Sequence, residues 1–209
     1  MRRLIEKPLN LCIGLLLIAG LGLLGAGLYI PAKALLAQAL LERAWQRTLD
    51  TEQASKPWPW ADTFPVARLR ARAHNVDLIV LDGEQGNSLA FAPGLHPASE
   101  IDRQSGTILI SAHRDTHFHF LKDIQIGEQF ELQNSEGETT QYRVEDVQVV
   151  NLHETRLISP TDGKWLVLVT CYPFDSLRSD PQQRFVVMAE ALEQTDEPEP
   201  MYAAKSDMY

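Results

Sequence analysis

An apolar run in the C-terminal part of the chain reads Leu166-Val167-Leu168-Val169-Thr170-Cys171-Tyr172-Pro173. Its alternating leucines and valines are typical of a buried strand, and Pro173 ends the run because proline has no N–H for a sheet ladder. Cys171 is therefore held at the end of a rigid strand, where a substrate can reach it, as a nucleophile requires. The plainer interpretation is that a free cysteine packs in a core as a small apolar residue.

A second β-type run, residues 107–112, ends directly before His113. A free thiol has a pKa of about 8.5 and is mostly protonated at neutral pH, whereas a neighbouring imidazolium stabilises the thiolate. A cysteine and a histidine at two strand ends are therefore a natural catalytic pair. We predict that His113 and Cys171 act together.

A third apolar run, residues 185–189, follows Arg184, which comes thirteen positions after Cys171. A connection of that length can join antiparallel neighbours, and pairing of these two strands would place Arg184 beside Cys171. There its permanent charge would stabilise an oxyanion. The alternative is a strand-end arginine in a surface ion pair, which contributes little to stability.

The composition is that of an ordinary folded domain, with 44% apolar and 22% charged residues in a chain of 209. With the N-terminal apolar segment set aside, enough residues remain for one hydrophobic core. The formal net charge of -9 argues against nucleic acid as a partner, because phosphate binding needs a basic surface.

Residues 9–30 form a stretch of 22 residues without a charge, long enough to cross a hydrocarbon layer ~30 Å thick as a helix. The alternative is a cleaved signal peptide, with Ala32-Lys33-Ala34 as the cleavage site. We favour a retained anchor, because the apolar core of a signal peptide is usually only about 7 to 15 residues long. More basic residues precede the span than follow it, which predicts a cytoplasmic N-terminus and an exported bulk.

Two segments connect this span to the rest of the chain. Residues 32–49 have near-helical apolar spacing, and we expect this helix to pack on the domain's own surface in preference to lying on the membrane. Residues 51–65 form a proline-bearing connector with Trp58 and Trp60. We expect these tryptophans to pack against the domain as plugs, with membrane-interface anchoring as the alternative. The predicted anchor and juxtamembrane helix together cover residues 1–50.

From Val66 onward the sequence changes to short β-type runs separated by turn signals. The predicted strands cover residues 66–72, 76–81, 107–112, 129–133, 140–150, 164–170 and 184–191. Many short strands at this spacing indicate an all-β sandwich or barrel, at residues 66–192. Residues 89–95 and 118–124 interrupt the pattern and are predicted to form short helical turns. The acidic segment 193–209 cannot bury much and is predicted to be a disordered tail.

Three motifs resemble the histidine, cysteine and arginine motifs of sortases: Ser111-Ala112-His113-Arg114, Thr170-Cys171-Tyr172-Pro173 and Arg184-Phe185-Val186-Val187. The chain is similar in particular to the sortases of Gram-negative bacteria, called class GN and related to class D. That likeness extends to Trp58-Pro59-Trp60-Ala61-Asp62-Thr63, Leu89-Ala90-Phe91-Ala92-Pro93-Gly94 and His113-Arg114-Asp115-Thr116-His117-Phe118. The chain departs from the family pattern at Ala112, where a glycine is expected, and in the polar segment 97–105. The resemblance implies a closed barrel of about eight strands behind an N-terminal transmembrane helix.

The resemblance also implies an activity, that of a cysteine transpeptidase. Sortases cleave a C-terminal sorting signal of a secreted protein through a thioacyl intermediate and transfer the acyl group to an amine. No metal and no organic cofactor is needed for this chemistry. The implied site consists of the nucleophile Cys171, the acid/base His113 and the oxyanion-stabilising Arg184, with Thr170, Asp115 and His117 as substrate-binding residues. The implied location is the inner (cytoplasmic) membrane, as a single-pass protein with its catalytic domain on the periplasmic side.

Three alternatives remain open at this point. His113, Asp115, His117 and His119 are of types that bind zinc, although their spacing matches no metal motif. The cysteine would also suit another envelope acyltransferase, such as an L,D-transpeptidase acting on peptidoglycan, for which serine and glycine are expected in place of Val169-Thr170. The third alternative is a non-catalytic anchored β domain that binds a partner.

Overall fold

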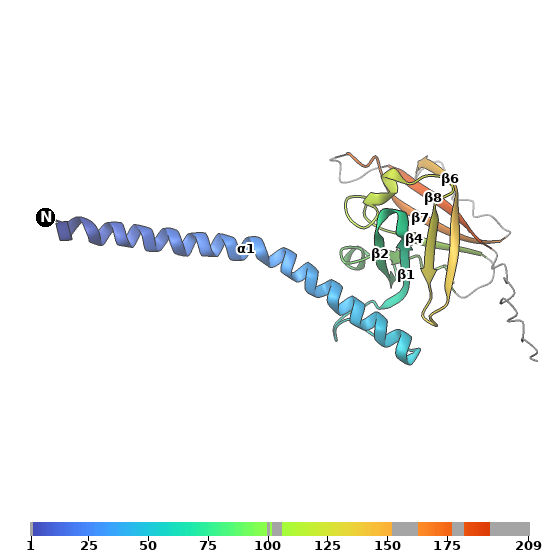
Figure 1. Ribbon diagram of the computed structural model, residues 1–209, viewed down its shortest axis with the longest axis horizontal. Helices are drawn as coiled ribbons and strands as arrows, with labels where there is room; N and C mark the ends of the chain where they lie inside the picture. Colours follow the sequence, from blue (N-terminus) through green and yellow to red (C-terminus); the bar gives the residue numbers. More distant parts are fainter. Residues whose placement is uncertain (1, 100, 102–105, 152–162, 177–181, 193–209) are drawn as a thin grey trace, which may run out of the picture.

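The computed structural model describes residues 2–99, 101, 106–151, 163–176 and 182–192. The predicted acidic tail, residues 193–209, lies outside these ranges. The described elements are, in chain order, α1 (Arg2–Thr51), β1 (Pro65–Ala71), η1 (Arg72–His74), β2 (Val76–Asp82), α2 (Gly86–Leu89), β3 (Gly94–Leu95), β4 (Gly106–Ser111), η2 (His119–Asp123), β5 (Gln129–Gln133), β6 (Thr139–Asn151), β7 (Lys164–Tyr172) and β8 (Gln183–Ala191). Figure 1 shows the long helix α1 projecting from one side of the β structure.

The eight strands close into a barrel in the order β1-β2-β3-β4-β7-β8-β6-β5. Most neighbours are antiparallel, but β2 with β3 and β4 with β7 run parallel, so the chain must cross over between the two strands of each of these pairs. A closed barrel leaves no unpaired sheet edge. The expected all-β barrel of about eight strands is confirmed.

The structure differs from the sequence prediction in the segment 89–95. The short helix α2 ends at Leu89, and the segment then includes the two-residue strand β3, which pairs with both β2 and β4. Two residues show no periodicity, so this strand is defined by its partners and not by its own sequence. The second helical turn, predicted at residues 118–124, is confirmed by η2.

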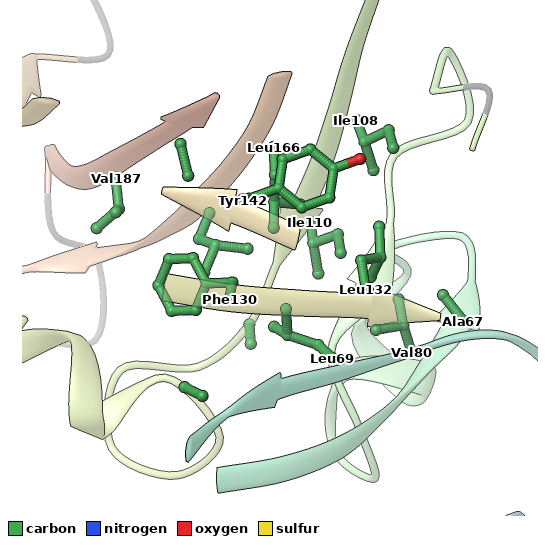
Figure 2. Close-up of a cluster of buried hydrophobic side chains, with 14 of the residues drawn as sticks. Ala67, Leu69, Val80, Ile108, Ile110, Phe130, Leu132, Tyr142, Leu166 and Val187 are labelled. Carbon is green, nitrogen blue, oxygen red and sulfur yellow. The ribbon is translucent and has the colours of Figure 1, made fainter. Parts of the chain in front are cut away.

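The barrel interior is filled by the inward-facing half of each strand. In β1 buried and partly exposed residues alternate strictly, as the period of two along a strand requires. The interior cluster brings together residues from all eight strands, and Figure 2 labels ten of its residues: Ala67, Leu69, Val80, Ile108, Ile110, Phe130, Leu132, Tyr142, Leu166 and Val187. Burial of the Tyr142 ring raises the pKa of its hydroxyl above the ordinary value.

The second half of α1 packs on the outside of the barrel. Leu41 and Trp45 are fully buried in a cluster with Ile79 and Leu81 of β2. An ion-pair network supports this contact: Arg68 of β1 bonds to Glu42 on α1 and to Asp77 on β2. The expectation that residues 32–49 pack on the domain's own surface is confirmed from Ala37 onward, whereas Leu35 and Leu36 are exposed.

The first half of α1 has no such cover. From Leu15 to Ile30 its described side chains are exposed, and by length and composition the helix is a candidate membrane span. Pro31 lies within α1 and removes one hydrogen bond of the helix ladder. In Figure 1 the helix bends part-way along its length, as an interior proline favours.

The two connector tryptophans differ in how far they are packed against the domain. Trp58 packs edge-on against Phe91 with ring centroids 5.4 Å apart, as expected of a plug. Trp60 is 83% exposed, so the prediction that it packs against the domain is wrong.

Substitution of Gly94 in β3 tests how closely this strand packs against the neighbouring backbone. A Cβ at this position would collide with the backbone of Gly83 and Glu84, which cannot move as a flexible side chain would. We expect Gly94→Ala to destabilise the protein by about 1–3 kcal/mol, measured as a lower Tm of the full chain in detergent. Gly86→Ala is the matched control, because its Cβ would meet open space. An equal loss in both variants would contradict this account of β3.

Candidate active site

Cys171 and Arg184 lie directly opposite each other on β7 and β8. Opposed residues of an antiparallel pair project from the same face of the sheet, with Cβ atoms ~4.5–5.5 Å apart. The sequence predicted this pairing from the length of the connection alone. Arg184 donates through Nη1 to the carbonyl of its neighbour Gln183 at 3.1 Å, and both Cys171 and Arg184 are half-buried.

His113 follows β4, which flanks β7 on the side opposite to β8. The parallel ladder between β4 and β7 pairs Ser111 with Val169, and the Ala112 N–H continues it by donating to the Val169 carbonyl at 3.2 Å. His113 lies two residues beyond the end of β4, and continuing the register by two residues past Ser111 and Val169 brings it near the level of Cys171. The strand ends of β4, β7 and β8 therefore bring His113, Cys171 and Arg184 into one row.

Thr170 fixes the backbone immediately before His113. Its Oγ1 donates to the Ala112 carbonyl at 2.7 Å, and the side chain is only 2% exposed. The hydroxyl donor is thus used within the barrel wall and not offered to a ligand. A substrate-binding role for Thr170 stays a prediction, and in this structure its hydroxyl holds two strands together.

The row lies on the outer face of the barrel wall. Leu166 and Leu168 of β7 point into the interior cluster, whereas Val167 and Val169 belong to a separate outer cluster with Val186. Because side chains alternate along a strand, Cys171 falls on the outer face with Val167 and Val169. A layer of buried valines thus continues the strand face that carries the thiol.

Arg114 follows His113 directly, and no sequence pattern predicted a part for it in the site. It is only 6% exposed, and its guanidinium donates to the carbonyls of Pro173 at 2.8 Å and Ser176 at 2.5 Å. It therefore joins the segment after His113 to the segment after Cys171. The one signal available in the sequence was a charged residue between two apolar stretches, and such a residue must find partners if it is buried.

Aromatic rings support the same segment after the cysteine. Tyr172 stacks on Phe185 with centroids 6.1 Å apart, and Phe174 packs edge-on against Phe185 at 5.1 Å. The His119 ring packs edge-on against the Phe174 ring, with centroids 6.5 Å apart. The two residues that flank the turn after Cys171 are thus held against β8.

His117 and Asp115 lie on the loop that follows His113. The pKa of His117 is lowered, first by burial and second by the positive charge of His113, while a hydrogen bond to the Phe91 backbone opposes the shift. His117 is therefore mostly neutral at pH 7. Asp115 is exposed and accepts a long hydrogen bond from Arg114 Nε at 3.4 Å. Their assignment to substrate binding stays a prediction.

The structure also bears on the zinc alternative. Within the described ranges, His113, Asp115, His117 and His119 do not form a group of ligands that can hold an ion.

The two hydrogen bonds from Arg114 to the carbonyls of Pro173 and Ser176, here called the Arg114 clamp, lead to a prediction about the turn after Cys171. Arg114→Lys keeps the charge, but a lysine donates from one point and cannot bridge two carbonyls as the guanidinium fork does. A hydrogen bond to a charged group contributes about 1.5–3 kcal/mol, so hydrogen exchange of the Ser176 amide should accelerate roughly tenfold or more. The matched control is Arg143→Lys, which alters an exposed pair with Glu145. Unchanged exchange at Ser176, or the same effect in the control, would contradict the clamp.

Comparison with known proteins shows which family the chain resembles. The family model described as the sortase domain matches residues 69–192. Sortase D of Bacillus subtilis (strain 168) is 31% identical over 114 residues, which cover 54% of this chain and 57% of that protein. The chain thus spans little more than half the length of this relative.

Solved structures of sortases share the fold. A Sortase D5 transpeptidase of Clostridium perfringens matches with a TM-score of 0.60 at 16% identity, over 75% of this chain and 98% of that one. The sortase C of Clostridium perfringens determined with the C-terminal cell wall sorting motif matches with a TM-score of 0.55 at 16% identity, over 78% and 90% of the two chains. At this identity these likenesses concern the fold alone. The family model, however, covers more than half of the 209 residues, including the strand ends that carry His113, Cys171 and Arg184, and the chain belongs to the sortase family.

Proposed function

We propose that this protein is a membrane-anchored cysteine transpeptidase that cleaves a C-terminal sorting signal of a secreted protein and transfers the acyl group to an amine. The observation that carries the proposal is the row of His113, Cys171 and Arg184 at adjacent strand ends. Membership of the sortase family supports the reaction type. The sorting motif in the sortase C structure of Clostridium perfringens supports the class of substrate.

The first half of the reaction forms the thioester. The Cys171 thiolate attacks the scissile carbonyl carbon, and the π electrons of the carbonyl move to its oxygen, where Arg184 stabilises the negative charge. When the oxyanion collapses, the carbon–nitrogen bond breaks. The departing amine takes a proton from the His113 imidazolium.

The second half releases the acyl group. An incoming amine attacks the thioester carbonyl and gives a proton to the now neutral His113, and the carbon–sulfur bond breaks to regenerate the thiolate. We propose that Asp115 and His117, on the loop after His113, contact the bound peptide. Thr170 contributes by holding β4 and β7 in register.

The anchoring part of the proposal rests on α1. We propose that residues 1–50 form the anchor and juxtamembrane helix, 51–65 the connector, 66–192 the catalytic domain and 193–209 a tail. The exposed apolar side chains of α1 need a nonpolar surrounding, which a bilayer supplies. The excess of basic residues before the span favours a barrel on the exported side. For a Gram-negative envelope that location is the periplasmic face of the inner membrane.

Loss of the nucleophile tests the reaction directly. The full chain, incubated with envelope proteins, should acquire on Cys171 an acyl adduct that hydroxylamine removes, detected by mass spectrometry of the intact protein. Cys171→Ala should lose the adduct entirely and keep its melting temperature, because a half-buried side chain at a strand end adds little to the core. Cys12→Ala, in the predicted span, is the matched control and should keep it. A hydroxylamine-sensitive adduct that survives Cys171→Ala would exclude covalent catalysis by this residue, and absence of any adduct from the wild type would favour a non-catalytic binding domain.

Substitution of Arg184 separates an oxyanion role from a structural one. Removal of one preorganised oxyanion donor typically costs ~10²- to 10³-fold in turnover. Arg184→Lys should therefore slow single-turnover acylation of Cys171 by a sorting-signal peptide by roughly tenfold or more, and Arg184→Ala by more still, with little change in Tm. Arg143→Ala, at an exposed position on β6, should be silent. A rate loss that only follows unfolding would leave Arg184 as a structural residue.

A further inference from the structure

Strand pairing ties the His113 and Cys171 segments together just before the two catalytic candidates. The Ala112 N–H donates to the Val169 carbonyl at 3.2 Å, and the Thr170 hydroxyl donates to the Ala112 carbonyl at 2.7 Å. His113 itself lies two residues beyond the end of β4. Past the end of this ladder, side-chain contacts must keep the two segments at a fixed separation, as a catalytic site requires.

Arg114 ties the same two segments together just after the catalytic candidates. Its Nη1 donates to the Pro173 carbonyl at 2.8 Å, and its Nη2 donates to the Ser176 carbonyl at 2.5 Å. This second tie begins one residue after His113 and two residues after Cys171. The histidine and the cysteine are therefore bracketed by hydrogen bonds on both sides along the chain.

The shape of the guanidinium suits this arrangement. Each of its three nitrogens has a different acceptor, because Nε donates to the Asp115 carboxylate at 3.4 Å in addition to the two carbonyl bonds. A planar fork fixes the directions of these donors relative to one another, whereas an ammonium group donates from a single point. Arg114 is only 6% exposed, so little water competes for the two carbonyls.

Two further contacts join the loop after His113 to the turn after Cys171. The His119 ring packs against the Phe174 ring, and Lys122 Nζ lies 3.8 Å from Asp175 Oδ1. The Asp175 side chain is 88% exposed, so this ion pair contributes little. Among the described contacts, the buried bonds of the Arg114 clamp are therefore the strongest connection between the two segments.

The proposed reaction depends twice on the separation of the two catalytic side chains. In the first half His113 protonates the amine that leaves the carbon attached to the Cys171 sulfur, and in the second half it deprotonates the amine that attacks the same carbon. Misplacement of a reacting group by about 1 Å can lower a rate roughly 10²-fold. A residue that fixes this separation controls the rate without touching the substrate.

We propose that Arg114 is a positioning residue for both halves of the reaction. By holding the turn after Cys171 against the loop after His113, it sets the separation between the imidazole and the sulfur. This inference rests on the proposed function of these two residues. Arg114 acts through the backbone of the turn and not by contact with the substrate.

A short bifunctional reagent measures this separation without a substrate. The Cys171 thiolate displaces one bromide of 1,3-dibromoacetone, and after excess reagent is removed, a ring nitrogen of His113 displaces the second bromide only if it lies within reach of the three-carbon bridge. The full chain carrying Cys12→Ala, in detergent, should form this crosslink, identified by mass spectrometry of the linked peptides. Arg114→Lys should slow the closure step by roughly tenfold or more, because the turn is no longer held at two points.

A second variant and two controls separate positioning from stability. Arg114→Gln buries no charge and cannot bridge both carbonyls, so it should slow closure even if the lysine variant does not fold. Arg143→Lys, at an exposed pair on β6, should close at the wild-type rate. Leu132→Val removes a buried methylene on β5, away from the row, and should lower the Tm without slowing closure in the folded protein.

Three outcomes would overturn the proposal. The first is closure at the wild-type rate in a folded Arg114 variant. The second is an equal slowing in Leu132→Val, which would reduce the effect of Arg114 to stability. The third is a wild-type protein that stops at the single alkylation of Cys171.

The acyl adduct on Cys171 separates this inference from the proposed function. With envelope proteins, Arg114→Lys should acquire the hydroxylamine-sensitive adduct roughly tenfold more slowly than the wild type, or more slowly still. A normal rate of adduct formation in this variant, despite slowed closure, would overturn the positioning role alone. A wild type that forms the crosslink but no adduct would overturn the proposed function, on which this role depends.

Discussion

The buried hydrogen bond from Thr170 Oγ1 to the Ala112 carbonyl closes the pairing of β4 with β7 at the point where their ladder ends. Without it the Ala112 carbonyl would lose this partner, at a cost of about 1–3 kcal/mol for an unsatisfied buried acceptor. Since β7 also pairs with β8, the same strand fixes Arg184 opposite Cys171. The alignment of the three catalytic candidates is therefore a property of strand register, and flexible side chains need to supply only the last adjustment.

Register alone does not control the turn that follows the cysteine. The Arg114 guanidinium holds this turn by donating hydrogen bonds to the carbonyls of Pro173 and Ser176. The packing of the Phe174 ring against Phe185 stabilises the same turn. A buried charge is tolerated because carbonyl oxygens replace the water it lost. The histidine segment and the cysteine segment are thus joined by direct hydrogen bonds, which restrain their relative positions.

Much of this arrangement was predictable from sequence, for identifiable reasons. Alternation in long runs predicted the strands around Cys171 and Arg184, and a short connection predicted their antiparallel pairing. Strand β3 was not predictable, because two residues carry no pattern and Gly94 owes its place to close contact with the backbone of Gly83. The hydrogen bonds of Arg114 and the exposure of Trp60 depend on which residues lie nearby in the fold although they are far away in the sequence. A single sequence shows the residue type at such positions but not which residues surround it.

The Phe91 peptide group lies between helix α1 and the loop that follows His113. Its carbonyl accepts from Gln38 of the helix, and its backbone also receives a hydrogen bond from His117, whose charge state responds to that of His113. A carbonyl has only two lone pairs, so both contacts use the same local geometry. The charge of His113 in turn lowers the pKa of His117, so helix α1 and the loop that follows His113 meet at this one peptide group.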